Sequence, residues 1–404
     1  MGKLGFAILL ASLVGLGILR PDIGWTQTKE VVIGVAHPLS GPSARFGIVL
    51  KNGWEMGVEE INAAGGIKSL GGAKMKLAFG DVVNKPDLAA SEIERLIKEY
   101  NPVMVAGCMA SSLTMVATQI AEKNRVPFLV DNATAPGITK RGFKYTFRCT
   151  QHSIACATTA FDFVEKVAQE GKKKPIKVAM IYEDTDYGIP YGEEIKKVAK
   201  NYNWEIVADE RFPSGTADLT LTVNKVKLRN PDVVFCVGYI NDIILLGRTI
   251  QSQKFQPKAI IHFGGASSMP DFMKALGKGA EYWYTGVAFA VDMKNPYNQK
   301  FVEKYNSRFK ELPNENAHNG YIAAYVAKEV LELAASADRE KVRDAFTRVH
   351  ITDGPGAGEG QIKFDPDGEL SNPQGILTQN LGGKPVTVWP PDVAASKAVY
   401  PMPK

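Results

Sequence analysis

Hydroxyl side chains occur in two loops that each follow a short apolar run, and hydroxyls placed there can bind an anion. Ser111 follows the run VMVAG (103–107), and Thr134 follows PFLVD (127–131) with Asn132 beside it. A helix is expected to begin near Ser111, and the free N–H groups of a helix N-terminus favour negative charge. Ordinary helix capping would explain one such hydroxyl. Two loops that converge instead predict a carboxylate site.

Aromatic residues follow other apolar runs. Phe46 comes after a Ser-Gly-Pro turn, and Tyr187 and Tyr239 each lie beside a glycine at the end of a strand-like run. A tyrosine has an apolar face and a polar tip, which suits it to close over a ligand. The alternative for each residue is a packed aromatic with no contact to ligand.

Signals for catalysis, metal binding and cofactors are weak. The chain has no phosphate-binding loop of the G-x-x-x-x-G-K type, no H-E-x-x-H and no G-x-S-x-G. The five histidines are scattered, and the cysteines show no metal spacing. We therefore expect no catalytic residue, no metal and no cofactor. Cys236 is expected to be buried, and a disulfide between Cys149 and Cys156 is left open.

Short apolar runs alternate with helical patterns, which indicates βαβ units and parallel sheets. Strands are expected at 31–36, 75–81, 103–107, 127–131, 177–184, 204–209, 232–238 and 258–264. Helices are expected at 47–63, 86–100, 112–124, 153–170, 191–202, 217–229, 242–253, 297–310 and 317–336. Two such blocks predict an α/β fold of two doubly wound lobes, which suits a chain of 404 residues.

The N-terminus predicts export. One lysine precedes an uncharged apolar stretch at 4–19, which is typical of a secretory signal, so residues 1–28 are interpreted as a signal peptide. An uncleaved membrane anchor is the alternative. The formal charge of +5 is spread along the chain, which argues against nucleic acid as a partner.

Several motifs together resemble the branched-chain amino acid-binding subfamily of type I periplasmic binding proteins. They are PLSGPSARFG (38–47), GVEEINAAGGI (57–67), the serines at 107–114, the segment 120–148 and YEDTDYG (182–188). The resemblance implies two lobes joined by a three-strand hinge, with lobe one at 29–149 plus 283–362 and lobe two at 150–282 plus 363–404. It also implies a periplasmic protein that delivers a small molecule to an inner-membrane ABC permease with cytoplasmic ATPases. A monomer is the default expectation for the oligomeric state.

The resemblance also implies site residues. The aromatic wall falls on Phe46, the carboxylate-binding serine on Ser111, a backbone donor and a hydroxyl on Asn132 and Thr134, and the closing tyrosines on Tyr187 and Tyr239. Met109 and Phe263 would add apolar walls.

One departure from the family pattern affects the ligand. Amino-acid binders hold the ligand ammonium with an acid from lobe two, whereas the matching segment 261–265 has no acid. Asp186 or Asp242 could substitute. An unpaired buried ammonium is costly, so the sequence favours an aromatic or other hydrophobic carboxylic acid. Branched-chain amino acids are the alternative ligand, a ligand-sensing receptor domain is a further alternative, and an exported enzyme lacks a catalytic set.

Overall fold

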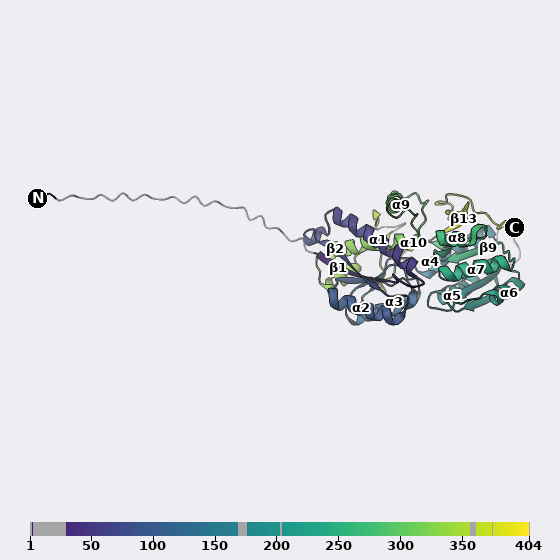
Figure 1. Cartoon of the computed structure of the whole chain (residues 1–404), viewed down its shortest axis with the longest axis horizontal. Helices are drawn as coiled ribbons and strands as arrows, with labels where there is room; N and C mark the ends of the chain where they lie inside the picture. Colours follow the sequence, from purple (N-terminus) through teal and green to yellow (C-terminus); the bar gives the residue numbers. More distant parts are fainter. Residues whose placement is uncertain are drawn as a thin grey trace.

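The computed structural model describes Gly2 and residues 30–168, 176–202, 204–355, 361–373 and 375–403. Within these residues the chain forms two α/β lobes that lie side by side (Figure 1). Apart from Gly2, the predicted signal peptide lies outside the described residues. No helix in the described part is long and apolar enough to cross a membrane.

Lobe one is built on a parallel five-stranded sheet with the order β2-β1-β3-β4-β5. Its strands are β1 (Glu30–His37), β2 (Lys74–Asp81), β3 (Met104–Gly107), β4 (Phe128–Val130) and β5 (Thr146–Arg148). In this doubly wound order the chain reverses direction across the sheet between β1 and β3, and ligands bind beyond the carboxyl ends of strands at such a point. The loops after β1 and β3 are therefore the expected walls of a site.

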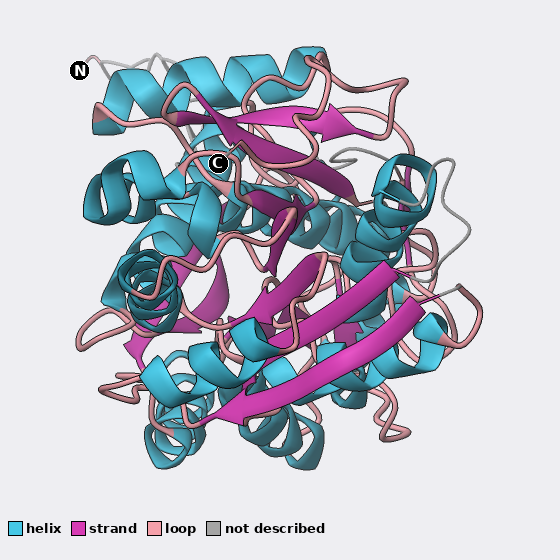
Figure 2. Ribbon diagram, turned by 90° about the vertical axis from the view of Figure 1, so that its right-hand side faces the viewer, coloured by secondary structure: helices cyan, strands magenta, loops and turns pink. Residues whose placement is uncertain are grey.

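Helices pack against this sheet, as they do in lobe two, which faces the viewer in Figure 2. The helices of lobe one are α1 (Ala44–Ala63), α2 (Pro86–Tyr100), α3 (Ser111–Lys123), α9 (Pro296–Phe309), α10 (Glu315–Ala334) and α11 (Arg339–Phe346). Helices α1 and α10 approach closely because both carry glycine at their contact. A Cβ atom at Gly53 would lie 2.0 Å from the carbonyl oxygen of Ala317, and one at Gly320 would lie 2.2 Å from that of Leu50. This close packing fixes where the N-terminus of α10 lies.

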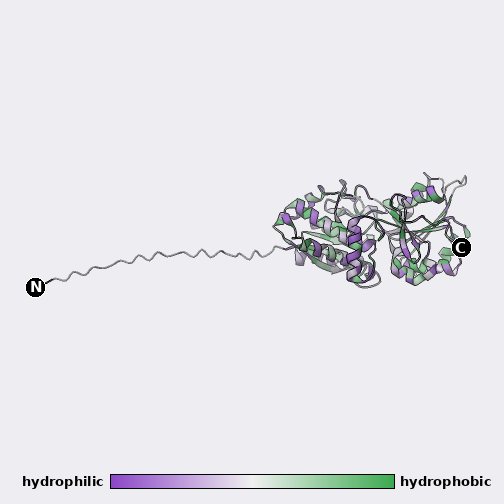
Figure 3. Cartoon of the chain, turned by 90° about the horizontal axis from the view of Figure 1, so that it is seen from above, coloured by the Kyte–Doolittle hydropathy of each residue, from purple (hydrophilic) through white to green (hydrophobic). Residues whose placement is uncertain are grey.

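Lobe two is built on a seven-stranded sheet with the order β14-β13-β10-β9-β8-β6-β7, in which β13 and β14 are antiparallel. Its strands are β6 (Ile176–Glu183), β7 (Trp204–Phe212), β8 (Val233–Val237), β9 (Ala259–Phe263), β10 (Tyr284–Val287), β13 (Ile376–Leu381) and β14 (Lys384–Trp389). The helices that precede or connect these strands are α4 (Ser153–Phe163), α5 (Gly188–Ala199), α6 (Thr220–Leu228), α7 (Ile240–Ser252) and α8 (Pro270–Leu276). The helices of both lobes carry hydrophilic as well as hydrophobic residues (Figure 3).

The chain passes between the lobes three times: after β5, after β10, and between the short pair β11 (His350–Ile351) and β12 (Ile362–Lys363) and strand β13. The predicted fold class, two doubly wound lobes with a three-strand connection, is confirmed. The predicted domain boundaries stay predictions. Since β10 pairs with β9 of lobe two, the sheet argues for a boundary after Val287 rather than before 283.

The expected strands and helices up to α7 are all present, with ends displaced by a few residues. The predicted helix 153–170 is the main difference, because α4 ends at Phe163 and a π turn follows over Val164–Ala168. Cys236 is fully buried, as expected. Cys149 is a free thiol, and the side chain of Cys156 lies outside the described part.

Candidate functional site

A cavity of about 40 Å³ lies between the two lobes, at the carboxyl ends of their strands. Its lining residues are Phe46, Met109, Ser111, Asn132, Ala133, Thr134, Thr150, Gln151, Tyr187, Tyr191, Gly238, Tyr239, Gly264, Glu315, Asn316 and Asn319. Seven of the eight residues proposed from the sequence are in this set, and Phe263 is not.

The first wall is the β3–α3 connection. A Cβ atom at Gly107, whose φ is +124°, would lie 1.9 Å from the carbonyl oxygen of Ala36, so glycine lets the end of β3 pass close to β1. Met109 and Ser111 follow at the cavity. Helix α3 begins at Ser111 without a side-chain cap. The Ser111 backbone N–H donates to the Tyr239 hydroxyl, and the N–H groups that follow carry the positive end of the helix dipole.

The second wall is the loop after β4. The buried guanidinium of Arg148 donates hydrogen bonds from Nη1 to the carbonyl oxygens of Ala133 (2.9 Å) and Ala135 (3.0 Å), which holds the loop in place. The backbone N–H of Ala135 donates to Ser111 Oγ (3.3 Å), which joins the two walls. The Thr134 hydroxyl lines the cavity, is buried and has no hydrogen-bond partner among the described residues. That hydroxyl is therefore a donor available to a ligand.

The third wall is aromatic and comes from both lobes. Phe46 of α1 meets Tyr239 edge-to-face with ring centroids 6.3 Å apart, and Tyr239 stacks on Tyr187 at 5.1 Å. The Tyr187 hydroxyl donates to the carbonyl oxygen of Phe263 (2.7 Å). A Cβ atom at Gly264 would lie 1.7 Å from that hydroxyl, so the tyrosine can take this position only because residue 264 is glycine. Burial raises the pKa of Tyr239 well above its usual range, so this hydroxyl stays neutral.

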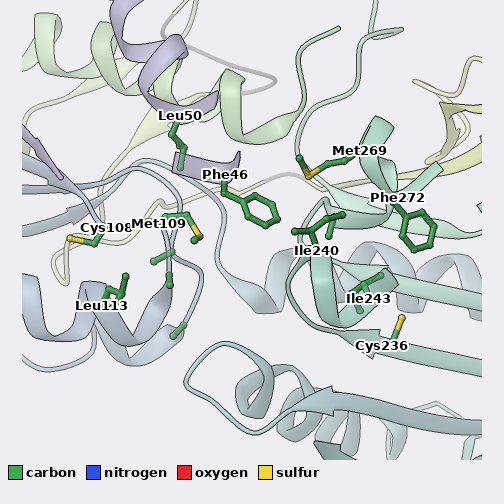
Figure 4. Packing of buried hydrophobic residues seen from close by; sticks show 14 of the residues in the cluster. Phe46, Leu50, Cys108, Met109, Leu113, Cys236, Ile240, Ile243, Met269 and Phe272 are labelled. Atoms are coloured by element: carbon green, nitrogen blue, oxygen red, sulfur yellow. The ribbon is translucent and has the colours of Figure 1, made fainter. Parts of the chain in front are cut away.

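Apolar side chains surround this aromatic wall and join the lobes. Figure 4 shows Phe46 and Met109 on one side of the interface, with Ile240 and Met269 on the other. All four residues belong to one buried cluster that extends through both lobes. The cavity therefore has an apolar border next to its polar loops.

Phe263 and the two candidate acids differ from expectation. The fully buried Phe263 ring stacks on Tyr191 and Phe235 inside lobe two, because alternate residues of β9 face opposite sides of the sheet. Asp242 accepts from the Ser214 hydroxyl and the Gly215 N–H, so it holds a neighbouring loop. Asp186 is exposed. Neither aspartate lines the cavity.

An acid that the sequence reasoning missed lines the cavity instead. Glu315 lies in the first turn of α10, and its Oε1 accepts hydrogen bonds from Gln151 Nε2 (2.9 Å) and from the Ala288 N–H (2.6 Å). Burial raises the pKa of Glu315 to about 7, although both hydrogen bonds oppose the rise. No lysine or arginine is among the lining residues in the part of the chain that the structure describes.

The missed polar residues come from segments where the sequence carries little signal. Asn316 and Asn319 follow Glu315 on α10, and Thr150 and Gln151 lie in the first crossing between the lobes. The sequence pattern predicts a helix that begins at 317, so it leaves Glu315 and Asn316 in the preceding loop. A first-turn acid and an Asn cap at 314 are the signals that could have found its true start.

Comparison with known proteins gives a consistent result. The family model described as "Periplasmic binding protein" matches residues 30–384. A Leu/Ile/Val-binding protein homolog 7 from Brucella suis biovar 1 (strain 1330) is 30% identical over 383 residues, which cover 93% of this chain and 95% of that protein.

Solved structures show the same fold at lower identity. A leucine binding protein from Thermotoga maritima has a TM-score of 0.79 at 23% identity and covers 90% of this chain and 99% of its own. A branched-chain amino acid transporter substrate binding protein from Streptococcus pneumoniae, in complex with isoleucine, has a TM-score of 0.79 at 22% identity, with 92% and 100% covered. An ABC transporter solute binding protein from R. palustris, in complex with benzoate, has a TM-score of 0.77 at 19% identity, with 92% and 97% covered.

Proposed function

This chain belongs to the periplasmic binding protein family, and on that premise we propose that it captures a small organic carboxylate for an ABC importer. The family consists of extracytoplasmic binding proteins, not enzymes. The proposal therefore concerns which molecule is bound, and between which walls.

One observation supports a carboxylate above all: the unpartnered Thr134 hydroxyl lies in the same cavity as the uncapped N-terminus of α3. A carboxylate can accept from the hydroxyl and from backbone N–H groups at once, and hydrogen bonds to a charged acceptor are about twice as strong as neutral ones. The dipole of the 13-residue helix α3 adds to the attraction.

The rest of the ligand would be apolar. Phe46, Met109, Tyr187 and Tyr239 present aromatic and thioether surface to the cavity. Two ligand classes fit such walls: a hydrophobic acid without an amino group, and a hydrophobic amino acid. Solved structures of similar proteins include an example of each class, since one is in complex with benzoate and another with isoleucine.

The proposed mechanism is lobe closure. The ligand would bind the α3 N-terminus and Thr134 on lobe one and the tyrosines on lobe two, so it contacts both lobes only when they are close together. A ligand shifts an equilibrium between open and closed forms only by its better affinity for the closed form. The closed form is then what an ABC permease would recognise.

A calorimetric binding screen of residues 29–404 tests the carboxylate. Pairs of probes differ only in that group: benzoate against benzamide, and L-leucine against L-leucinamide. We expect the carboxylate of at least one pair to bind and its amide to bind at least about 10-fold more weakly. A saturating carboxylate, at about 100 times its Kd, should add about 2.7 kcal/mol to the unfolding free energy.

Two variants locate the group within the cavity. Thr134→Val removes the free hydroxyl while keeping the shape, and we expect an affinity loss of about 10-fold for any carboxylate that binds. Ser112→Ala is the matched control, because Ser112 neighbours Ser111 but does not line the cavity. Equal affinity for acid and amide, or equal loss in both variants, would contradict the proposal.

A further inference from the structure

We propose that Glu315 selects the ligand: its carboxylate binds a cationic nitrogen next to the ligand's own carboxylate, and so replaces, from the opposite side of the cleft, the acid that lobe two lacks. This inference rests on the proposed function and names the ligand class within it, an amino acid or a similar zwitterion. It reverses the preference for an acid without an amino group.

The two oxygens of Glu315 have different surroundings. Oε1 is occupied by the N–H donors of Gln151 and Ala288, which belong to two of the three crossings between the lobes. Oε2 faces the loop after β9, since a Cβ atom at Gly265 would lie 3.3 Å from it. One carboxylate oxygen therefore anchors the side chain, and the other is turned to the segment where an acid is missing.

Glycine in the loop after β9 leaves room for this arrangement. The segment 261–265 has no acid, and Gly264 and Gly265 carry no side chain that could hold a ligand. Gly265 has φ of +78°, a conformation that glycine adopts at low cost. The absence of side chains at these two glycines leaves room for Glu315 of α10 beside the loop.

A second acceptor and a donor accompany Glu315. The Gln151 Oε1 atom is buried and has no partner within the described residues, because the amide turns its NH₂ group to Glu315. Asn316 Nδ2 is likewise a buried donor that no described group accepts from. An ammonium carries three N–H donors, so it satisfies both Gln151 Oε1 and Glu315 Oε2, and the Asn316 amide is left to the ligand carboxylate.

The other charged groups near Glu315 are paired, exposed or neutral. On α10, His318 bonds Asn298, and burial lowers its pKa to about 3, so it carries no charge. Glu311, before α10, pairs with Arg45. From lobe two, Lys384 of the β13–β14 hairpin is exposed and lines an adjoining cavity that Glu315 also lines.

The first crossing adds no free charge either, because Arg148 is paired with Glu369. Among the described residues Glu315 forms no salt bridge, and no lysine or arginine lines the cavity between the lobes.

The pH dependence of binding follows from this geometry. In the ligand-free protein Glu315 has a pKa of about 7, so below neutral pH it is largely protonated and cannot pair with a cation. A free amino acid stays zwitterionic from about pH 3 to pH 9, so its ammonium is charged throughout this range. Affinity should therefore rise by up to about tenfold per pH unit from pH 5 to pH 7 and level off above pH 8, with release of a proton on binding.

The experiment compares L-leucine with 4-methylpentanoate, and L-phenylalanine with 3-phenylpropanoate, by calorimetry from pH 5 to pH 8.5. Each pair differs only in the amino group. For the wild-type protein at pH 8 we expect at least one amino acid to bind about 10-fold to 100-fold more tightly than its partner. Glu315→Gln should remove that advantage and flatten the pH profile, while affinity for the deaminated acid changes by less than about threefold.

Two further variants keep the result interpretable. Glu315→Asp retains the charge but withdraws it by one methylene, so part of the affinity and the pH dependence should remain. Glu329→Gln removes an acid from the same helix away from the cavity and should have no effect. A binding-competent Glu315→Gln is shown by its unchanged affinity for the deaminated acid.

Three outcomes overturn the inference. Equal binding of both members of every pair, or binding of deaminated acids alone, would do so and would leave the proposed carboxylate function intact. Unchanged amino-acid affinity in Glu315→Gln would do the same. Binding of no carboxylate at all would overturn the proposed function together with this inference.

Discussion

Among the described residues, burial raises the pKa of three carboxyl groups: Asp242, Glu183 and Glu315. Burial raises the pKa of both Glu315 and Glu183 to about 7, from an ordinary value of 4.5. Between those two values the folded chain binds more protons than the unfolded chain, so the free energy of unfolding falls as pH rises. Each of these two glutamates can account for at most about 3–4 kcal/mol of that loss, since one pKa unit corresponds to about 1.4 kcal/mol.

The difference between wild type and Glu315→Gln isolates one of these groups. Relative to wild type, the variant should gain unfolding free energy as pH rises from 5 to 8, measured by urea denaturation without ligand. The difference is needed because buried histidines act in the opposite direction: burial lowers the pKa of His262 to about 4 and that of His318 to about 3. A difference that stays constant from pH 5 to pH 8 would show that Glu315 keeps an ordinary pKa.

At the level of the elements, one buried ion pair joins the loop after β4, which carries Thr134, to the crossings between the lobes. Arg148 ends β5, Glu369 lies just before the third crossing, and Arg148 Nε donates to Glu369 Oε1 at 2.9 Å. Removal of one partner of such a pair leaves an uncompensated buried charge. Because Arg148 also holds the carbonyl groups of Ala133 and Ala135, the loop that carries Thr134 depends on it as well.

We expect Arg148→Met to lower the free energy of unfolding by about 3–5 kcal/mol, measured by chemical denaturation, and to weaken carboxylate binding. The double variant Arg148→Met with Glu369→Leu should lose less, because no unpaired charge remains. An equal loss in both variants would mean that the bonds to the loop carbonyls, not the ion pair, account for the effect.

Helix α10 shows which parts of the site could be predicted from the sequence. Ser111 and Thr134 could be found because they follow apolar strands directly, and parallel sheets bring strand ends together. Glu315 could not be found in this way, because its position depends on the contact between α10 and α1. These helices are about 260 residues apart in the chain and meet at Gly53 and Gly320. No local pattern encodes that contact. The short strands β5 and β10 escaped prediction for the same reason, since they are defined by their neighbours in the sheet.

At the scale of the whole molecule, the lobes meet through an apolar seam and a charged contact. The seam includes Phe46, which lies against Tyr239. The charged contact joins Arg45 Nε to Asp271 Oδ2 at 3.5 Å, and both side chains are partly exposed. Ligand affinity measures the closed state, so it reports which contact matters more for closure.

We expect the apolar seam to dominate. Burial of an aromatic side chain is worth about 1.5–3 kcal/mol, so Phe46→Ala should weaken ligand binding by about 10-fold or more. A partly exposed ion pair contributes about 0–1 kcal/mol and is screened by salt, so Asp271→Asn should change affinity by no more than about fivefold, and less at 0.5 M NaCl. Calorimetry of both variants at low and high salt separates the two contributions. A larger and salt-sensitive loss of affinity in Asp271→Asn would mean that the charged contact contributes most to lobe closure. The aromatic wall would then contribute only through its contact with the ligand.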